Sequence, residues 1–178
     1  MRLAGILLFI LLAGPALAQR EVDDQSKLSD RLYFGGGLGL NGGTDAYGQR
    51  YFFVGLYPVV GYMVNNQFSV GTGITFQYYS YPDAPANYAS SLTQYGVSPF
   101  ARYNFGQLFM YTEYMFLNSP TYINNQRKTF NRLLLGVGFS QPIGQRSSLN
   151  VMGLYDVLWK QSDYAFASPW VFRVYFSI

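Results

Sequence analysis

Residues 57–80 read YPVVGYMVNNQFSVGTGITFQYYS, two strand-like runs joined by the turn-like triplet Asn65-Asn66-Gln67. In the second run, larger and mostly apolar residues alternate with small or polar ones. The larger set is Phe68, Val70, Thr72, Ile74, Phe76 and Tyr78, and the set between them is Ser69, Gly71, Gly73, Thr75, Gln77 and Tyr79. A period of two residues is typical of a strand whose two faces meet different surroundings. The stretch therefore predicts a hairpin in a two-faced sheet.

The same alternation recurs along the chain and predicts eight strands, near residues 31–41, 51–64, 68–80, 93–105, 108–118, 129–141, 148–159 and 170–178. The connections after the first, third, fifth and seventh strands are long: 42–50, 81–92, 119–128 and 160–169. Those after the second, fourth and sixth are tight: 65–67, 106–107 and 142–147. Long outer loops and short periplasmic turns are typical of outer-membrane barrels. We therefore predict an all-β fold, an eight-stranded antiparallel up-and-down transmembrane β-barrel over residues 31–178.

The composition favours a membrane barrel over a water-soluble one. Charged residues make up 12% of the chain and aromatic residues 19%, a poor supply of charge for a soluble surface. In a lipocalin, the soluble alternative, the apolar face would surround a ligand and the other face would be wet; here the other face is rich in glycine and suits a crowded interior. The apolar face would then meet lipid, between aromatic girdles. We expect Phe52, Tyr78, Phe116, Trp159 and Trp170 near one rim and Tyr62, Tyr103 and Phe176 near the other.

The N-terminus has the pattern of an export signal. Arg2 precedes an apolar run, and Ala16-Leu17-Ala18 has the small-x-small pattern of a signal-peptidase site. We predict a signal peptide over 1–18, a flexible periplasmic leader over 19–30, and a location in the outer membrane of a Gram-negative bacterium. The chain has no cysteine, which excludes disulfides, thiolate metal sites and the usual lipoprotein anchor.

Two prolines interrupt predicted strands in the same phase. Pro58 and Pro99 both fall on the lipid-facing side, at equal distance from the tight turn that follows each strand. Proline has no N–H to donate to a strand ladder. A closed barrel has no edge strand on which a proline could lie without the loss of a ladder hydrogen bond. We expect a local bulge or bend at this level.

These segments also carry a family resemblance. Pro58-Val59-Val60-Gly61-Tyr62, followed by the Asn-Asn turn and Phe68-Ser69-Val70-Gly71-Thr72-Gly73, resembles the small outer-membrane β-barrel family common in Bacteroidetes. Pro99-Phe100-Ala101-Arg102-Tyr103 resembles that family's second Pro-x-x-x-Tyr segment. The resemblance covers essentially all of the chain after the signal and implies fold and location, with little about activity. The chain ends in Ile178 where such barrels often end in Phe, but the aromatic alternation before it suits recognition by the barrel-insertion machinery.

No residue pattern points to catalysis or to a cofactor. Membrane-barrel hydrolases and proteases generally rely on a histidine base, and this chain has no histidine. Gly35-Gly36-Gly37-Leu38-Gly39 lacks the lysine and helix of a phosphate loop, and the carboxylates are scattered singly, so neither nucleotide nor metal binding is expected. A net charge of +3, one less without Arg2, is too small to indicate nucleic-acid binding.

Five charged residues fall on the predicted inner face, one on each of the last five strands: Arg102, Glu113, Arg132, Asp156 and Arg173. Buried charges in a membrane need partners. Diagonal spacing across neighbouring strands predicts Glu113 between Arg102 and Arg132, and Asp156 facing Arg173. An ion network that plugs the lumen is favoured over a gate or solute path, because eight strands leave an interior only just wide enough for side chains.

Two functions stay open at this point. The first is a non-enzymatic, monomeric membrane anchor whose four outer loops serve surface interaction or envelope integrity. Its loops at 81–92 and 119–128 are rich in Tyr, Asn, Ser and Pro, as binding loops often are. The alternative is a narrow channel for small solutes or ions through a polar lumen.

Overall fold

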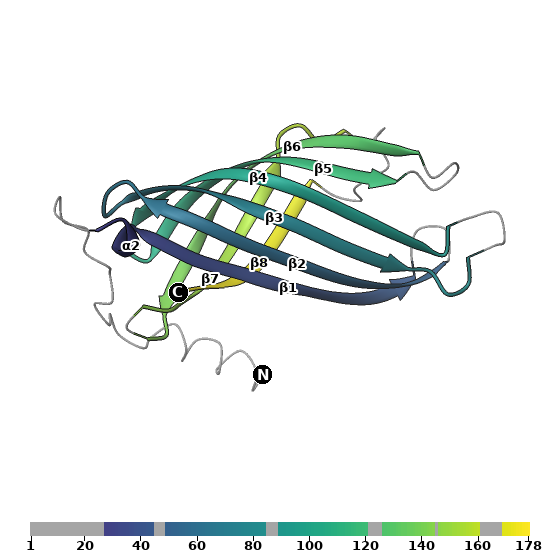
Figure 1. Ribbon diagram of the computed structural model, residues 1–178, viewed down its shortest axis with the longest axis horizontal. Helices are drawn as coiled ribbons and strands as arrows, with labels where there is room; N and C mark the ends of the chain where they lie inside the picture. The colour runs from purple at the N-terminus through teal and green to yellow at the C-terminus, as the bar shows by residue number, and fades with distance from the viewer. Residues whose placement is uncertain (1–26, 45–48, 85–88, 121–125, 145, 161–168) are drawn as a thin grey trace, which may run out of the picture.

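The computed structural model describes residues 27–44, 49–84, 89–120, 126–144, 146–160 and 169–178, so the predicted signal peptide and most of the predicted leader lie outside it. Eight antiparallel strands, each paired with its neighbours in sequence, close into one barrel (Figure 1). The strands are β1 (Leu32–Thr44), β2 (Arg50–Met63), β3 (Phe68–Ser80), β4 (Ser91–Phe105), β5 (Leu108–Pro120), β6 (Arg127–Pro142), β7 (Ser148–Asp156) and β8 (Trp170–Ser177). The predicted eight-stranded up-and-down barrel is therefore confirmed.

Every strand end lies within three residues of its predicted position, and two differences matter for the rest of the structure. The helix α2 (Leu28–Arg31) forms a single turn at the end of what was predicted to be an irregular leader. The strand β7 ends at Asp156, three residues early, because the chain turns there: the Trp159 N–H donates to the Asp156 carbonyl oxygen at 3.3 Å. The strands β7 and β8, with 9 and 8 residues, are shorter than β1 to β6 (Figure 1).

The two faces of the strands are as the alternation predicts. In β8, Phe172 is 80% exposed and points outward, whereas Tyr175 is buried inside. The predicted girdle residues are mostly on the outer face; those with exposed side chains are Phe52, Tyr78, Tyr103, Phe116, Trp170 and Phe176. Trp159 is the exception, because the early end of β7 takes it off the strand and over the barrel mouth.

The prolines interrupt the ladder without a bulge. Both are exposed on the outer face, as predicted. Between β2 and β3 the pairs Leu56↔Phe76 and Val59↔Gly73 enclose a two-residue gap that contains Pro58, and the register is the same on both sides of the gap. A gap of the same size contains Pro99 between β4 and β5. The expected bulge is therefore wrong: each strand omits two ladder pairs on one side and keeps its register.

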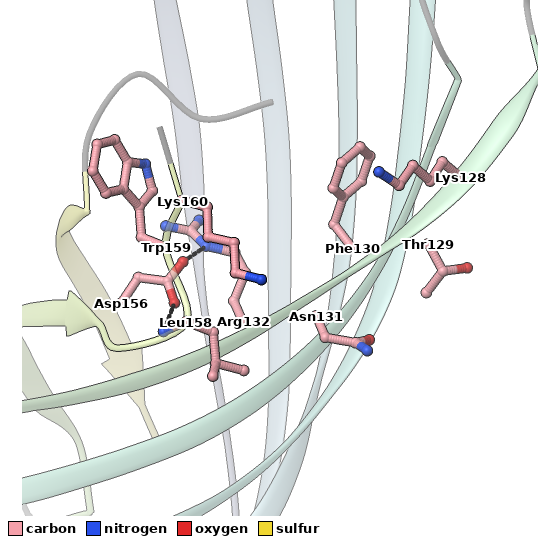
Figure 2. Close-up of a pocket in the computed structure, with 9 residues that line it drawn as sticks. All are labelled: Lys128, Thr129, Phe130, Asn131, Arg132, Asp156, Leu158, Trp159 and Lys160. Atoms are coloured by element: carbon pink, nitrogen blue, oxygen red, sulfur yellow. Dashed lines mark hydrogen bonds and ion pairs between the residues drawn. The ribbon is translucent and has the colours of Figure 1, made fainter. Parts of the chain in front are cut away.

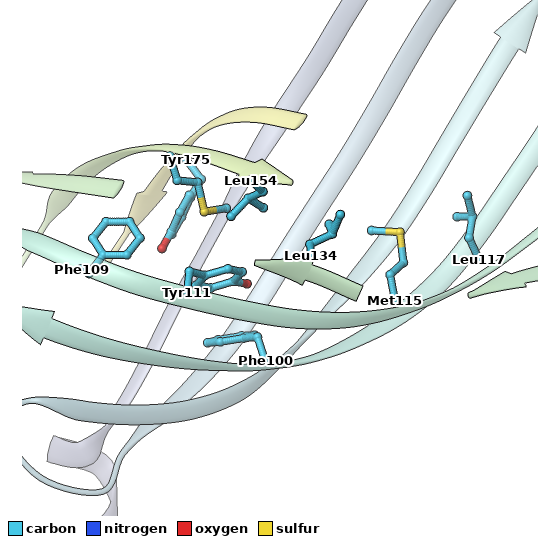
Figure 3. Packing of buried hydrophobic residues seen from close by; sticks show 9 residues of the cluster. Phe100, Phe109, Tyr111, Met115, Leu117, Leu134, Leu154 and Tyr175 are labelled. Carbon is cyan, nitrogen blue, oxygen red and sulfur yellow. The ribbon is translucent and has the colours of Figure 1, made fainter. Parts of the chain in front are cut away.

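The inner faces of the strands combine large side chains with glycines. Buried residues on the inner faces of β4 to β8 form one cluster (Figure 3): Phe100, Phe109, Tyr111, Met115, Leu117, Leu134, Met152, Leu154 and Tyr175. The inner faces of β1 to β3 contain Gly35, Gly37, Gly39, Gly55, Gly61, Gly71 and Gly73. The lumen is thus a mixed apolar and polar core, not the uniformly small, polar interior that β3 and β4 alone indicate.

The seam that closes the barrel is short. The ladder between β1 and β8 consists of Gly35↔Ser177 and Gly36↔Phe176, extended by reciprocal hydrogen bonds between the backbones of Phe34 and Ile178 at 3.0 and 2.7 Å. Along the described part of β1, this ladder does not continue beyond Gly36, whereas β1 pairs with β2 over its whole length. Closure therefore rests on one end of β1.

The close contacts of the inward-facing glycines predict that alanine is more destabilising on the inner face than on the outer face. A Cβ at Gly71 would lie 2.5 Å from the Phe100 ring and closer still to the Val60 carbonyl oxygen, whereas a Cβ at outward-facing Gly153 would have ordinary contacts from 3.4 Å. We expect Gly71→Ala to lower the free energy of unfolding in detergent by about 1–3 kcal/mol through overpacking. Gly153→Ala should change it much less. Equal denaturant midpoints for the two variants would contradict the packing described here.

Candidate functional site

The charged residues of the interior lie on the inner face, as predicted. Glu113, Asp156, Arg132 and Arg102 are at most 9% exposed, and Arg173 is partly buried. Ionised groups with so little water need partners within hydrogen-bond distance. Together with their hydrogen-bonding partners, these five residues form three polar layers, one above another along the barrel axis.

The middle layer is an ion pair that crosses the lumen from β5 to β8. The Arg173 guanidinium donates to both carboxylate oxygens of Glu113, at 2.6 and 3.1 Å. The Tyr111 hydroxyl donates to the same carboxylate at 3.0 Å. Two-point Arg–carboxylate contacts are among the stronger and more directional hydrogen bonds in proteins. This pair therefore ties together two strands that are not neighbours in the sheet.

The outer layer, toward the long connections, joins β6 to the end of β7. Arg132 Nε donates to Asp156 Oδ2 at 2.6 Å, and the Leu158 N–H donates to Asp156 Oδ1 at 3.1 Å. An aspartate that accepts from the N–H two residues later fixes the local turn. Asp156 thus uses one oxygen to neutralise a buried cation and the other to shape the chain above it.

The inner layer, toward the short turns, contains a buried arginine bound by neutral groups. Arg102 donates to Asn104, Asn150 and Tyr175 oxygens at 2.7, 3.0 and 2.9 Å, and its guanidinium carbon lies 3.9 Å from the centre of the Phe109 ring. Oxygen acceptors and an aromatic face each stabilise a cation. Among the described residues, Arg102 makes no ion pair with a carboxylate.

The predicted pairing of these charges is wrong, although the predicted strand register is right. Glu113 does lie diagonal to Arg102 and Arg132, since Phe100↔Glu113 and Glu113↔Leu134 are ladder partners. It binds Arg173 instead, while Arg132 binds Asp156 and Arg102 binds neutral oxygens. Asp156 does not face Arg173, because Arg173 pairs with Met152, which lies four residues before Asp156 on β7, nearer the short-turn end.

A pocket opens at the mouth, directly above the outer layer (Figure 2). We call it the mouth pocket; it has a volume of about 100 Å³ and is lined by Lys128, Thr129, Phe130, Asn131, Arg132, Asp156, Leu158, Trp159 and Lys160. The Lys128 ammonium lies 5.1 Å from the centre of the Phe130 ring. Sequence analysis missed this site, because Trp159 and Lys160 were assigned to a strand end and a loop. The basic and aromatic residues that flank Asp156 and Arg132 in sequence were the available signal.

Other ionic contacts lie outside the interior, near the long connections. Arg50, at the start of β2, donates to both oxygens of Asp83 at 2.5 and 2.8 Å. These hydrogen bonds hold the pKa of the Asp83 carboxyl below its usual value. The Arg127 guanidinium lies over the Tyr95 ring, 4.4 Å from its centre. These contacts link the β2 start to the β3–β4 connection and the β6 start to β4. The middle parts of the predicted binding loops lie outside the described residues.

The described residues do not offer the grouping that metal binding would use. No three His, Cys, Asp or Glu side chains among the described residues lie close enough to hold a metal ion. No helix in the described part of the chain is long and apolar enough to cross a membrane. Among the described residues, the Ser98 hydroxyl is buried without a hydrogen-bond partner.

Comparison of the chain with known proteins found no match. No family model matches the chain, no curated protein matches it, and no solved structure matches it. The resemblance to the Bacteroidetes barrels therefore stays a hypothesis based on short motifs, and function has to be argued from the fold and the sites.

The cross-lumen pair predicts a specific energetic coupling. Glu113→Gln leaves the buried Arg173 without its counter-charge, and breaking one side of a buried pair costs about 3–5 kcal/mol of unfolding free energy. Arg173→Met alone should be similarly costly, and the double variant should lose clearly less than the sum. Chemical unfolding in detergent micelles gives these values.

Arg102→Met supplies the matched control, because Arg102 is one of the two cations, with Arg132, between which the sequence predicts Glu113. Its effect should add to that of Glu113→Gln, apart from a small long-range contribution. A strong coupling of Glu113 to Arg102, with none to Arg173, would contradict the geometry.

Proposed function

We propose that the protein is a non-enzymatic outer-membrane β-barrel, a monomeric membrane anchor that presents its long connections and mouth at the cell surface. The observation that supports this most is the inverted distribution of polarity. Exposed apolar side chains follow the outer face of every strand, with Leu38 at 76% and Phe172 at 80% exposure, while the charged layers are inside. Monomeric soluble proteins rarely expose apolar surface on this scale, whereas a bilayer would cover it.

The direction of insertion follows from the connections. The tight turns after β2, β4 and β6 would lie in the periplasm, and the long connections after β1, β3, β5 and β7 at the surface. The alternating aromatic C-terminal strand β8 supports delivery to the barrel-insertion machinery. The partners that this proposal requires are outer-membrane lipid on the outside and a surface ligand at the mouth, without nucleic acid or cofactor.

The filled interior favours the anchor over the channel. Leu134 and Leu154 are completely buried, and Phe109 and Leu117 are 1% exposed, so apolar side chains occupy the lumen between the polar layers. A solute path would need these side chains and the Glu113–Arg173 pair to move together. A static plug requires no such movement.

The membrane proposal predicts that two similar substitutions destabilise the protein to different extents. Val174 lies in the middle of β8 on the outer face and is 56% exposed; Val157 is 51% exposed just beyond β7 at the rim. In a bilayer, Val174→Arg should cost about 2–4 kcal/mol of unfolding free energy and Val157→Arg about 0–1. Folding into lipid vesicles, followed by urea titration, measures both.

A water-soluble barrel would tolerate arginine at both exposed positions, so equal and small effects would overturn the membrane proposal. Fractionation provides an independent measurement. The protein should sediment with outer membranes and resist extraction by high salt, and its recovery in the soluble periplasmic fraction would also contradict the proposal.

Because side chains fill the lumen, we predict that the barrel does not conduct ions. The protein in planar lipid bilayers should show no steady conductance, because side chains fill an eight-stranded interior. A conducting porin inserted under the same conditions serves as the positive control. Stable, reproducible channels would instead favour the alternative, a narrow path for small solutes or ions.

A further inference from the structure

The mouth pocket lies outside the plug and opens toward the long connections. Figure 2 shows Lys128, Phe130 and Arg132 on the side of β6 that faces Trp159 and Lys160, while Thr129, Asn131 and Leu158 point the other way. The pocket therefore has an aromatic wall, a charged floor and ammonium groups at two edges.

The pocket has an excess of positive charge. Lys128, Arg132 and Lys160 line it together with one carboxylate, Asp156. That carboxylate already accepts from Arg132 Nε and from the Leu158 N–H. The two lysines, both exposed, are left with no carboxylate in the lining to neutralise them, and such a concave positive site attracts anions.

The aromatic wall is held in place by the plug. Asp156 fixes the turn after β7 through its side chain, and its carbonyl oxygen accepts from the Trp159 N–H at 3.3 Å. The Val157 N–H donates to the Leu133 carbonyl oxygen at 2.8 Å and ties the same turn to β6. The backbone that carries Trp159 and Lys160 is thus positioned before any ligand arrives, which lowers the entropic cost of binding.

We propose that the mouth pocket binds an anionic sugar, a carboxylate or phosphate group carried on a pyranose ring. The lysines contact the anion, and the C–H face of the ring packs on the Trp159 indole, a large surface with a polar N–H at its edge. Engineered cavities of about 150 Å³ hold a benzene ring. A pocket of about 100 Å³ that is open on one side takes the anionic group and one edge of the ring, and leaves the rest of a saccharide outside.

The test uses refolded full-length protein in detergent micelles, with D-glucuronate, D-glucose 6-phosphate, D-glucose and inorganic phosphate as probes. The chain has two tryptophans, so Trp170→Leu on the outer face leaves Trp159 as the only reporter. We expect a saturable change in Trp159 fluorescence with one or both anionic sugars, and dissociation constants at least about tenfold lower than for glucose or phosphate alone. The two anionic probes distinguish a preference for carboxylate from one for phosphate.

Matched variants separate this site from general charge attraction. Lys160→Gln and Lys128→Gln should each weaken binding by about tenfold. Arg146→Gln, which removes one positive charge from the connection between β6 and β7 at the opposite end, should leave it unchanged. In calorimetry on the otherwise unaltered protein, Trp159→Leu should weaken binding more than Trp170→Leu does.

Three results would overturn the inference: no saturable signal with either anionic sugar, glucose or phosphate binding as tightly as the anionic sugars, or equal losses from Arg146→Gln and Lys160→Gln. That the ligand belongs to a surface saccharide rests on the proposed function, but the binding itself does not. If the protein fractionates away from the outer membrane but binds the probes, the proposed function is contradicted and the binding site is not. If the protein fractionates with the outer membrane but binds neither anionic sugar, only the inferred binding site is contradicted.

Discussion

An eight-stranded barrel encloses a space that side chains alone can fill, and that narrowness governs the rest of this molecule. Residue sizes inside it have to complement one another, so glycines on the inner faces of β1 to β3 make room for neighbouring rings. Gly61 lies against the Tyr33 ring and Gly71 against Phe100. Charge inside the same space meets little water, so each ionised group needs hydrogen-bonding partners, and Glu113 and Arg173 find theirs across the lumen.

Asp156 connects this interior to the surface. Its contact with Arg132 belongs to the plug, and its contact with the Leu158 N–H builds the turn that carries Trp159 and Lys160. Stability and recognition therefore share one carboxylate. A substitution of Asp156 would therefore alter the mouth pocket as well as the interior. The Glu113–Arg173 pair lies deeper and joins two strands without contacting that pocket.

Much of the fold follows from the sequence because its period is two and its turns are short. Face assignment needs only that period, so Pro58, Pro99 and the five interior charges were placed on the correct sides. Partner choice was not predictable, because Glu113 and Arg173 lie on strands that do not touch in the sheet and local spacing carries no information on distances across the lumen. The early end of β7 was also hidden, since Val157-Leu158-Trp159 is as apolar as a strand. It was Asp156, accepting from two backbone N–H groups, that ended the strand.

The short seam between β1 and β8 also bears on how the chain assembles. Every other ladder joins consecutive strands, so the sheet can grow hairpin by hairpin, with each new strand added at little cost in loop entropy. The seam alone joins residues about 140 positions apart, Gly36 and Phe176. Until β8 arrives, the growing sheet has two open edges of the kind that invite intermolecular pairing. The last few residues therefore determine whether the sheet ends as a closed monomer or remains an open template for aggregation.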